Sequence, residues 1–271
     1  MGHQPFKVFF KLGSPLIIGE YPLHLDALLM HELAVETFGA RAYNRSQEEL
    51  EELSLPLKQS GEHYPIWHAS QGRALSPVRW GKDLFTRNTY TDYATREKAI
   101  PNDFVDYNSA ISIETPTGGP SRSQEAGAYR GVKAYLAYIA TPGLAFYGNG
   151  DINKVRELLK DVVALGSDRN RGYGRVLSMK VMPLKKDYSV WAKDGSPARF
   201  LPLDDWSSPN GARGGKIDWS VPSPPYWDSA RRVLGYAPAG IVLMEEDEGK
   251  DLKAIKRAEE DDDEEIDWEE E

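Results

Sequence analysis

The sequence predicts a protein of the α+β class, because strand-like and helix-like segments alternate in its two better-patterned regions. Residues 6–12 are rich in aromatic and β-branched side chains, and residues 23–38 carry apolar residues near the helical period. A strand-like, a helical and a second strand-like stretch follow at residues 131–139, 151–165 and 175–182. With 40% apolar residues, the 271-residue chain can bury a sizeable core.

The first region opens with a predicted strand and a predicted helix. Residues 6–12 are followed by the breaking sequence Gly13-Ser14-Pro15 and by a short apolar run, residues 16–18. A helix then begins near Leu23, and Gly39 suits its carboxyl cap. The apolar stripe of this helix consists of Leu25, Leu28, Leu29, Leu33 and Phe38.

The middle of the chain interrupts this pattern. Residues 46–120 mix charged, aromatic and turn-forming residues, so we interpret them as an insertion, with one strand-like piece at residues 110–114. After the strand predicted at residues 131–139, Asp151 can cap a helix that runs to about Leu165. A glycine-rich loop, residues 166–174, connects this helix to the strand predicted at residues 175–182.

The last part of the chain has few regular patterns. Eight prolines between residues 183 and 240 argue against long helices or strands and predict an irregular segment that wraps the domain. Residues 245–271 hold 16 Asp and Glu against four Lys and Arg, a net charge of −12 within a total of −9, which leaves +3 on residues 1–244. We therefore expect a single domain, residues 1–244, and a disordered acidic tail, residues 245–271.

The sequence argues against a membrane span, a secretory signal and cysteine-based sites. The longest apolar runs fall far short of the roughly 20 residues that a membrane span needs, so we expect no membrane partner. The amino terminus lacks the features of a secretory signal, and we expect a cytoplasmic protein. The absence of cysteine excludes disulfides and thiolate metal sites, and we expect no cofactor and no metal.

The glycine-rich loop is the sharpest candidate for a binding site. Gly166, Gly172 and Gly174 free its backbone to approach a ligand, and exposed amides in such loops can cradle phosphates. The loop also offers side chains that can neutralise phosphates or stack on a base, namely Arg169, Arg171, Arg175 and Tyr173. An ordinary helix cap with a tight turn explains the same residues equally well. The loop follows a helix and lacks Gly-Lys-Ser/Thr, so it is not a nucleotide-binding P-loop.

Residues 67–98 form a second candidate, in which aromatic and basic residues interleave. Basic side chains can bind a nucleic-acid backbone, and aromatic rings can stack on bases. The residues that we select for RNA binding here are Arg73, Arg79, Trp80, Lys82 and Arg87. The alternative is a charged surface loop whose rings belong to the core; the position inside a long insertion favours a binding element.

Two histidines of the first predicted helix could support chemistry on RNA. His24 and His31 are seven residues apart and can project from one face of the helix. Either could act as a general base toward an RNA 2′-hydroxyl. Capping or packing explains His24 at a helix start more simply, and Asp26 and Glu32 do not complete a persuasive metal site.

Three sets of residues resemble the RAMP superfamily of CRISPR-Cas proteins. They are the helix opening Pro22-Leu23-His24-Leu25-Asp26-Ala27-Leu28-Leu29, the loop at residues 166–176, and the segment Pro224-Pro225-Tyr226-Trp227. This last segment, with Ala198-Arg199-Phe200-Leu201-Pro202 before it, is most similar to the subunit of type IV complexes that holds the 5′ handle of the guide RNA. The resemblance spans residues 5–240.

The resemblance implies a ferredoxin-like (RRM-like) βαββαβ core, a glycine-rich loop that faces RNA, and an inserted thumb-like element between neighbouring subunits. By character and position, the thumb falls within residues 68–100, while the acidic tail lies outside the family pattern. His24 and Asp26 match the helix opening. The matching loop positions are Gly166, Arg169, Arg171, Gly172, Gly174 and Arg175.

The function that the resemblance implies is structural, with no catalytic residue. The subunit would clamp the crRNA 5′ handle, cap the filament of backbone subunits, and help to position target DNA near the protospacer-adjacent motif. Its partners would be the crRNA, the backbone and large subunits of the effector complex, and the target DNA duplex. Two alternatives stay open: a metal-independent guide-processing endoribonuclease of the same superfamily that uses His24 or His31, and a protein-interaction module.

Overall fold

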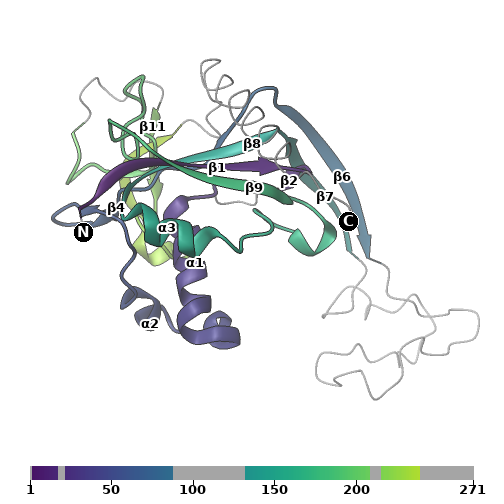
Figure 1. Ribbon diagram of the computed structural model, residues 1–271, viewed down its shortest axis with the longest axis horizontal. Helices are drawn as coiled ribbons and strands as arrows, with labels where there is room; N and C mark the ends of the chain where they lie inside the picture. Colours follow the sequence, from purple (N-terminus) through teal and green to yellow (C-terminus); the bar gives the residue numbers. More distant parts are fainter. Residues whose placement is uncertain (1, 18–21, 88–131, 208–214, 239–271) are drawn as a thin grey trace, which may run out of the picture. The chain divides into compact units, whose positions relative to one another are not determined.

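A four-stranded antiparallel sheet forms the centre of the larger of two units in the chain (Figure 1). The structure is a computed structural model that describes residues 2–17, 22–87, 132–207 and 215–238. Every neighbouring pair of strands in this sheet is antiparallel. In sheet order, the strands are β5 (Arg73–Ala74), β8 (Gly143–Gly150), β1 (Gln4–Leu12) and β9 (Val176–Pro183).

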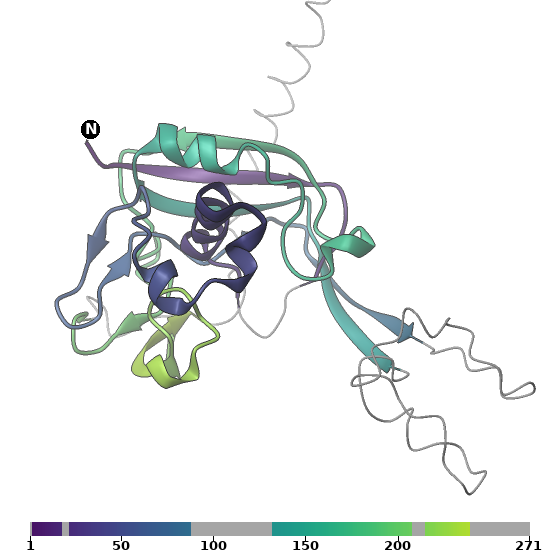
Figure 2. The same ribbon diagram turned by 90° about the horizontal axis from the view of Figure 1, so that it is seen from below.

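Two helices, α1 (Leu25–Phe38) and α3 (Ile152–Leu159), cover one face of this sheet (Figures 1 and 2). Side chains alternate between the two faces of a strand, so every second residue of β1 points toward the helices. The core between sheet and helices includes Phe6, Val8, Phe10, Leu25, Leu29, Val155 and Leu159. On the other face, Phe9 packs with Leu75, Ala145 and Met182. Burial on both faces explains the nearly unbroken apolar run of β1.

This arrangement confirms the α+β class, the first strand and the first helix. Within this layer, the chain runs through β1, α1, β5, β8, α3 and β9, so strand, helix, strand, strand, helix and strand follow one another. None of the helices in the described ranges is long and apolar enough to cross a membrane.

Helix α3 has the predicted start but an earlier end. The Asp151 carboxylate accepts hydrogen bonds from the backbone N–H groups of Asn153 (3.1 Å) and Lys154 (3.2 Å), which confirms the predicted cap. The helix ends at Leu159 instead of Leu165. Backbone pairing explains the difference, because Leu165 N–H donates to the carbonyl of Gly174 (2.8 Å). Residues 163–165 thus pair with residues 174–176 at the base of the glycine-rich loop.

Strand β8 is missing from the sequence analysis, although all eight of its residues are buried. Its sequence contains three glycines and no β-branched residue, which is unfavourable for an isolated strand. Packing against β1 explains two of these glycines. A Cβ atom on Gly148 would lie 2.4 Å from the Phe6 ring, and one on Gly143 would lie 2.6 Å from the Phe9 ring.

The second unit, Gly81–Tyr138, contains most of β6 (Arg79–Arg87) and β7 (Val132–Ala140), which are neighbours in a sheet. The Tyr138 ring packs closely against the backbone at Gly81, where an added Cβ atom would lie 2.2 Å from it. Strand β7 confirms the strand predicted at residues 131–139. The strand-like piece predicted at residues 110–114 lies outside the described residues.

Residues 55–75 contribute to the main core, although the sequence analysis assigned them to the insertion. Leu55, Leu57, Ala69 and Ala74 are buried in the same cluster as the sheet and helices. The remaining elements of this part of the chain are β2 (Leu16–Ile17), a 3-10 helix (Gly39–Asn44), α2 (Gln47–Glu51), β3 (Gln59–Ser60) and β4 (Ile66–Trp67).

Side-chain hydrogen bonds join the β3–β4 hairpin to β8. The Ser60 hydroxyl is 2.9 Å from His68 Nε2, and His68 Nδ1 is 2.8 Å from a carboxylate oxygen of Asp187. Asn149 Nδ2 and Ser189 N–H also donate to Asp187, at 2.8 and 2.9 Å. Burial alone would raise the pKa of Asp187, but these hydrogen bonds outweigh burial and hold the pKa well below its usual range. The charged carboxylate therefore fixes the hairpin on the sheet.

A second antiparallel sheet forms near the end of the described chain. Its order is β10 (Leu201–Pro202), β12 (Val233–Pro238) and β11 (Gly215–Ser220). The sequence analysis predicted an irregular segment here, and the structure instead forms two six-residue strands. Their prolines explain the difference, because β11 has none and Pro238 is the last residue of β12. A 3-10 turn, Ser229–Arg231, lies between the two strands.

Candidate nucleic-acid interface

The glycine-rich loop is anchored to the turn that follows β1. Gly174 N–H donates to the carbonyl of Pro15 (2.7 Å), and Arg175 N–H donates to the Ser14 hydroxyl (2.9 Å). On the other side of the loop, Ser167 N–H donates to the carbonyl of Ile17 (3.0 Å). A 3-10 turn, Arg169–Arg171, lies between these anchors. The base of the loop is thus fixed on both sides, while residues 169–172 are exposed.

The three loop glycines have positive φ angles: 80° at Gly166, 86° at Gly172 and 65° at Gly174. A Cβ atom at Gly174 would lie 1.8 Å from the Leu165 carbonyl oxygen, and one at Gly166 would lie 2.4 Å from that of Ile17. Glycine is therefore needed at both positions for the close approach of two backbone segments. Gly172 has open space around it, so a ligand can reach the backbone there.

The loop presents more positive than negative charge. The side chains of Arg169, Arg171 and Arg175 are exposed, and residues 166–175 carry a net charge of +2 because Asp168 is their only acidic residue. Arg171 Nη1 lies 2.8 Å from a carboxylate oxygen of Asp168, which holds the guanidinium over the turn. Tyr173, which lies between Arg171 and Arg175 in the sequence, is half-buried. A basic, exposed loop with accessible backbone is suited to an anionic ligand.

Arg79 lies near the same turn as the loop. Residues 13–15, whose backbone and side chains contact Gly174 and Arg175, also line a hollow of about 370 Å³ together with Arg79. The next residue, Trp80, is 67% exposed. The structure therefore brings Arg79 and the loop to a common turn, with an exposed aromatic ring adjacent in sequence.

Three other predicted residues do not join this group. Arg73 lies in β5, with its guanidinium carbon 5.6 Å from the centre of the Tyr147 ring. Lys82 is exposed in the second unit. Arg87 is the last residue of β6, and its side chain lies outside the described part of the structure.

His24 is placed at the amino end of α1 but is buried. The residue is 6% exposed, and its ring stacks on Tyr226 with 4.4 Å between ring centres. Burial, reinforced by the positive charge of Arg199 and opposed by Asp26, lowers the pKa of His24 to about 4. The imidazole is therefore neutral at pH 7 and provides no charge for a phosphate.

His31 lies two turns further along α1. His24 and His31 both line a cavity between α1 and the glycine-rich loop. His31 Nε2 is 4.0 Å from a carboxylate oxygen of Glu32. Within the described ranges, no three His, Asp or Glu side chains are placed to hold a metal ion.

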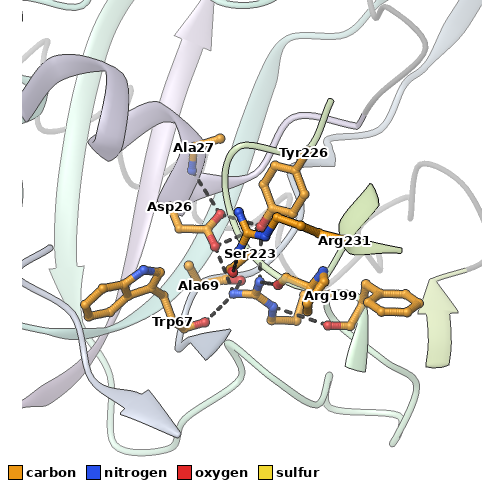
Figure 3. A network of polar contacts seen from close by, with 10 residues as sticks. Asp26, Ala27, Trp67, Ala69, Arg199, Ser223, Tyr226 and Arg231 are labelled. Atoms are coloured by element: carbon orange, nitrogen blue, oxygen red, sulfur yellow. Dashed lines mark hydrogen bonds and ion pairs between the residues drawn. The ribbon is translucent and has the colours of Figure 1, made fainter. Parts of the chain in front are cut away.

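A buried polar network ties α1 to two distant segments of the chain (Figure 3). Arg199 and Asp26 are fully buried, and Arg199 Nη1 lies 3.0 Å from a carboxylate oxygen of Asp26. The Tyr226 hydroxyl is 2.8 Å from the same carboxylate and 3.1 Å from Arg199 Nη2. Arg199 also donates to the backbone carbonyls of Trp67 and Pro222. Burial raises the pKa of Tyr226 well above its usual value, so the hydroxyl stays protonated.

The sequence analysis included all three residues of this network in the family resemblance, but it did not predict that they contact one another. Asp26, Arg199 and Tyr226 each belong to a segment that carried the family resemblance, and those segments meet in the interior instead of at a surface. One signal was available: Arg199 stands between Ala198 and Phe200-Leu201, an apolar setting that is unusual for an arginine with a solvated head.

The family model of CRISPR type IV associated protein Csf3 matches residues 4–238. A search of curated proteins returned no match.

Two chains of solved structures are matched at low identity. One chain of the "Cryo-EM structure of the Type III-B Cmr-beta bound to cognate target RNA" is 10% identical with a TM-score of 0.34, over 67% of this chain and 61% of that chain. This chain thus spans less than two thirds of that relative. One chain of the "Crystal structure of Csm3-Csm4 subcomplex in the type III-A CRISPR-Cas interference complex" is also 10% identical with a TM-score of 0.34, over 89% of this chain and 93% of that chain.

Proposed function

The chain belongs to the family of CRISPR type IV associated protein Csf3, and on this premise we propose that it is a non-catalytic, guide-RNA-binding subunit of a type IV effector complex. Its role is to clamp the 5′ handle of the crRNA. The glycine-rich loop is the main contact surface. Sequence reading is left to base pairing between guide and target.

The observation that carries this proposal is the construction of the loop. Its base is fixed by hydrogen bonds to residues 14, 15 and 17, while Arg169, Arg171 and Arg175 are exposed around open backbone at Gly172. A preorganised loop loses little conformational entropy when a ligand binds. Arginine offers several N–H donors that match phosphate oxygens. The backbone of a single-stranded RNA supplies such groups at every nucleotide.

The topology of the central sheet supports the ferredoxin-like core that accompanies this role. The chain order β1, α1, β5, β8, α3, β9 is the βαββαβ succession, and the sheet order places β1 and β8 in the centre. The glycine-rich loop then connects the second helix of this succession to its last strand.

The finer part of the proposal concerns partners. The neighbouring strands β6 and β7 include the exposed residue Lys82, and they are suited to a thumb-like element that contacts neighbouring subunits. Capping of the backbone filament and positioning of target DNA near the protospacer-adjacent motif would use this element. Residues 88–131, which lie between β6 and β7 in the sequence, are outside the described residues.

A guide-processing endoribonuclease is the second candidate, because His24 and His31 line one cavity beside the loop. General acid–base catalysis works best when the pKa lies near the operating pH. The pKa of about 4 at His24 is too low for an efficient base at pH 7 and disfavours this candidate.

The test is to express the full chain with its native repeat–spacer RNA, to sequence the RNA that co-purifies, and to measure affinity for it across a salt series. We expect bound RNA with a defined 5′ handle and an affinity that falls steeply with salt. Incubation of the same RNA without metal distinguishes the endoribonuclease from the non-catalytic subunit. Specific cutting that is lost in His31→Ala would support the endoribonuclease and contradict the non-catalytic role. Absence of salt-dependent RNA binding would favour a protein-interaction module.

A further inference from the structure

Strand β11 lies at one edge of the sheet β10–β12–β11, and within the described residues β12 is its only neighbour in the sheet. Its sequence is Gly-Lys-Ile-Asp-Trp-Ser, residues 215–220. In this part of the structure, one side of the β11 backbone is thus open. An open strand edge is a template for pairing with a strand of another chain.

Backbone hydrogen bonding identifies the residues that face the open edge of β11. The carbonyl of Leu234 in β12 accepts a hydrogen bond from Leu203 N–H (3.1 Å), so the polar groups of Leu234 are turned toward β10. In an antiparallel pair, opposite residues either exchange hydrogen bonds or both turn away from each other. Trp219 is opposite Leu234 and therefore turns its backbone groups toward the open edge. The same alternation places those of Gly215 and Ile217 there.

One face of β11 is apolar and exposed. The exposed fraction is 60% for Ile217 and 62% for Trp219, which share a face because they are two residues apart on a strand. Leu234, opposite Trp219 on the same face, is 38% exposed. Large apolar side chains that gather beside an open strand edge are typical of a surface that another polypeptide covers.

The other face of β11 carries a pair of opposite charges. Lys216 Nζ donates to a carboxylate oxygen of Asp218, and both side chains lie at the surface. Asp218 also accepts a hydrogen bond from Trp219 N–H (2.8 Å). The bond from Lys216 and then the bond from Trp219 lower the pKa of Asp218, so the carboxylate is charged at pH 7. A lysine on an edge strand opposes pairing unless a carboxylate lies opposite it.

A second copy of β11 supplies that carboxylate. When two copies pair antiparallel about a two-fold axis at Ile217, Lys216 of each copy lies opposite Asp218 of the other. Ile217 then lies opposite Ile217, and Trp219 lies opposite Gly215, a large side chain against a small one. An axis at Asp218 instead sets two carboxylates opposite each other, and an axis at Lys216 sets two ammonium groups opposite each other. Charge complementarity therefore selects the axis at Ile217.

We propose that β11 is an interface between two copies of this chain, which pair antiparallel about a two-fold axis at Ile217. The two three-stranded sheets then form one continuous sheet, and residues 215, 217 and 219 exchange backbone hydrogen bonds across the axis. The contact is closed, because the same residues contribute on both sides, so it joins two copies only. It uses none of the residues proposed to bind RNA and is independent of that function.

The first test is the mass of the full chain in solution, measured by sedimentation equilibrium across a wide range of concentrations. We expect the mass to rise from 30.4 kDa toward twice that value. Lys216→Asp and Asp218→Lys should each weaken association about tenfold, because two attractive pairs become like-charge pairs. Lys185→Asp, an exposed change outside β11 with the same change in net charge as Lys216→Asp, is the matched control and should associate like the wild type.

A mixture of the two charge variants gives a sharper result. In a mixed dimer, each altered residue lies opposite a residue of the opposite charge. We therefore expect Lys216→Asp chains and Asp218→Lys chains to associate with each other about as tightly as wild-type copies do, although each variant alone associates weakly. A fluorescent label on one variant reports the mixed dimer.

A disulfide cross-link detects the pairing even where association is weak. The chain has no cysteine, so Ile217→Cys introduces a single thiol. Opposite residues that exchange hydrogen bonds have Cα atoms about 5.5 Å apart, which a disulfide can span. We expect Ile217→Cys to form covalent dimers under mild oxidation much faster than Val163→Cys, whose original side chain is 76% exposed outside β11.

Two results would overturn the proposal. One is an Ile217→Cys chain that cross-links no faster than Val163→Cys. The other is a dimer that both charge variants form as readily as the wild type, since such a dimer uses another surface. The cross-linking comparison decides the matter even when a charge variant does not fold. RNA affinity is measured separately, so failure of this interface leaves the RNA-binding proposal unchanged.

Discussion

At the scale of single residues, the buried charges of Asp26 and Arg199 need partners, and each is the partner of the other. Transfer of either charge from water to the interior is unfavourable by several kcal/mol, so each depends on the other and on added hydrogen bonds. Tyr226 and the backbone carbonyls of Trp67 and Ala69 provide those bonds (Figure 3). Loss of one partner therefore leaves an uncompensated charge in the core.

We predict that Arg199→Met destabilises the protein by about 3–5 kcal/mol, because the Asp26 carboxylate is left buried without its cation. The free energy of unfolding in urea measures this loss. Lys216→Met is the matched control, since Lys216 pairs with Asp218 on an exposed strand, where a change within about 0.5 kcal/mol is expected. Equal effects of the two substitutions would show that Arg199 is not buried as described.

The pH dependence of stability provides a second prediction at this scale. The pKa of His24 is about 4 in the folded chain, against 6.5 for an unperturbed histidine. Between these values the unfolded chain binds a proton that the folded chain does not, so stability falls as the pH drops from 6.5 to 4. The loss amounts to about 3 kcal/mol and is complete below pH 4.

We expect His24→Phe to remove this part of the pH dependence, measured as unfolding free energy at several pH values. Asp26, Arg199, Tyr226 and His31 surround the ring or its cavity and are unchanged in the variant. Carboxylates with lowered pKa act in a different window: stability from Asp205, whose pKa hydrogen bonds lower to about 2 against the effect of burial, is lost only as the pH falls below 3.8. Parallel curves for wild type and variant between pH 4 and 6.5 would contradict a buried, neutral His24.

At the scale of elements, sequence patterns predicted those parts whose pattern is local. Composition and capping chemistry predict the strand at residues 6–12, the helix capped by Asp151 and the loop between α3 and β9. Strand β8 does not, because its glycines are selected by the rings of Phe6 and Phe9 on a neighbouring strand. The end of α3 is set by pairing with residues 174–176, which a window on the helix cannot contain.

The loop glycines should respond differently to the same substitution. Gly172→Ala meets open space and places an alanine at positive φ, which costs about 1–2 kcal/mol. Gly174→Ala drives a Cβ atom into the Leu165 carbonyl, so the backbone must move and loses the bonds to Pro15 and Leu165, with about 1 kcal/mol more for each. Urea unfolding and RNA affinity measure both effects. A larger loss at Gly172 than at Gly174 would contradict this loop geometry.

At the scale of the whole molecule, the family assignment made from sequence motifs is confirmed by the match over residues 4–238. The binding role of the candidate residues stays a prediction. Two of them could not be placed from the sequence: His24 stacks on Tyr226, which is 202 residues away, and Arg73 lies over a ring of β8. Contacts at such sequence distances leave no periodic signal in a single chain.

Charge distribution gives a prediction for the tail, which lies outside the described residues. Residues 245–271 carry −12 beside a body of +3, so the tail can compete with RNA phosphates within the same molecule. Truncation after Met244 should raise affinity for random RNA at low salt, and the gain should shrink as salt screens both interactions. Equal binding of both forms across a salt series would leave only a solubilising role for the tail.

The most direct test of the central claim is the salt-dependent affinity of the full chain for its co-purified RNA after Arg169→Glu, Arg171→Glu and Arg175→Glu together. Loss of three phosphate contacts should weaken binding severely and reduce the slope of log K against log salt by about 2. The control replaces Lys185, Lys186 and Lys216, all exposed and away from the loop, with Glu, for the same change in net charge. We predict a severe loss for the arginine variant and a small one for the control. Wild-type affinity and slope in a folded arginine variant would contradict the assignment of this loop to RNA.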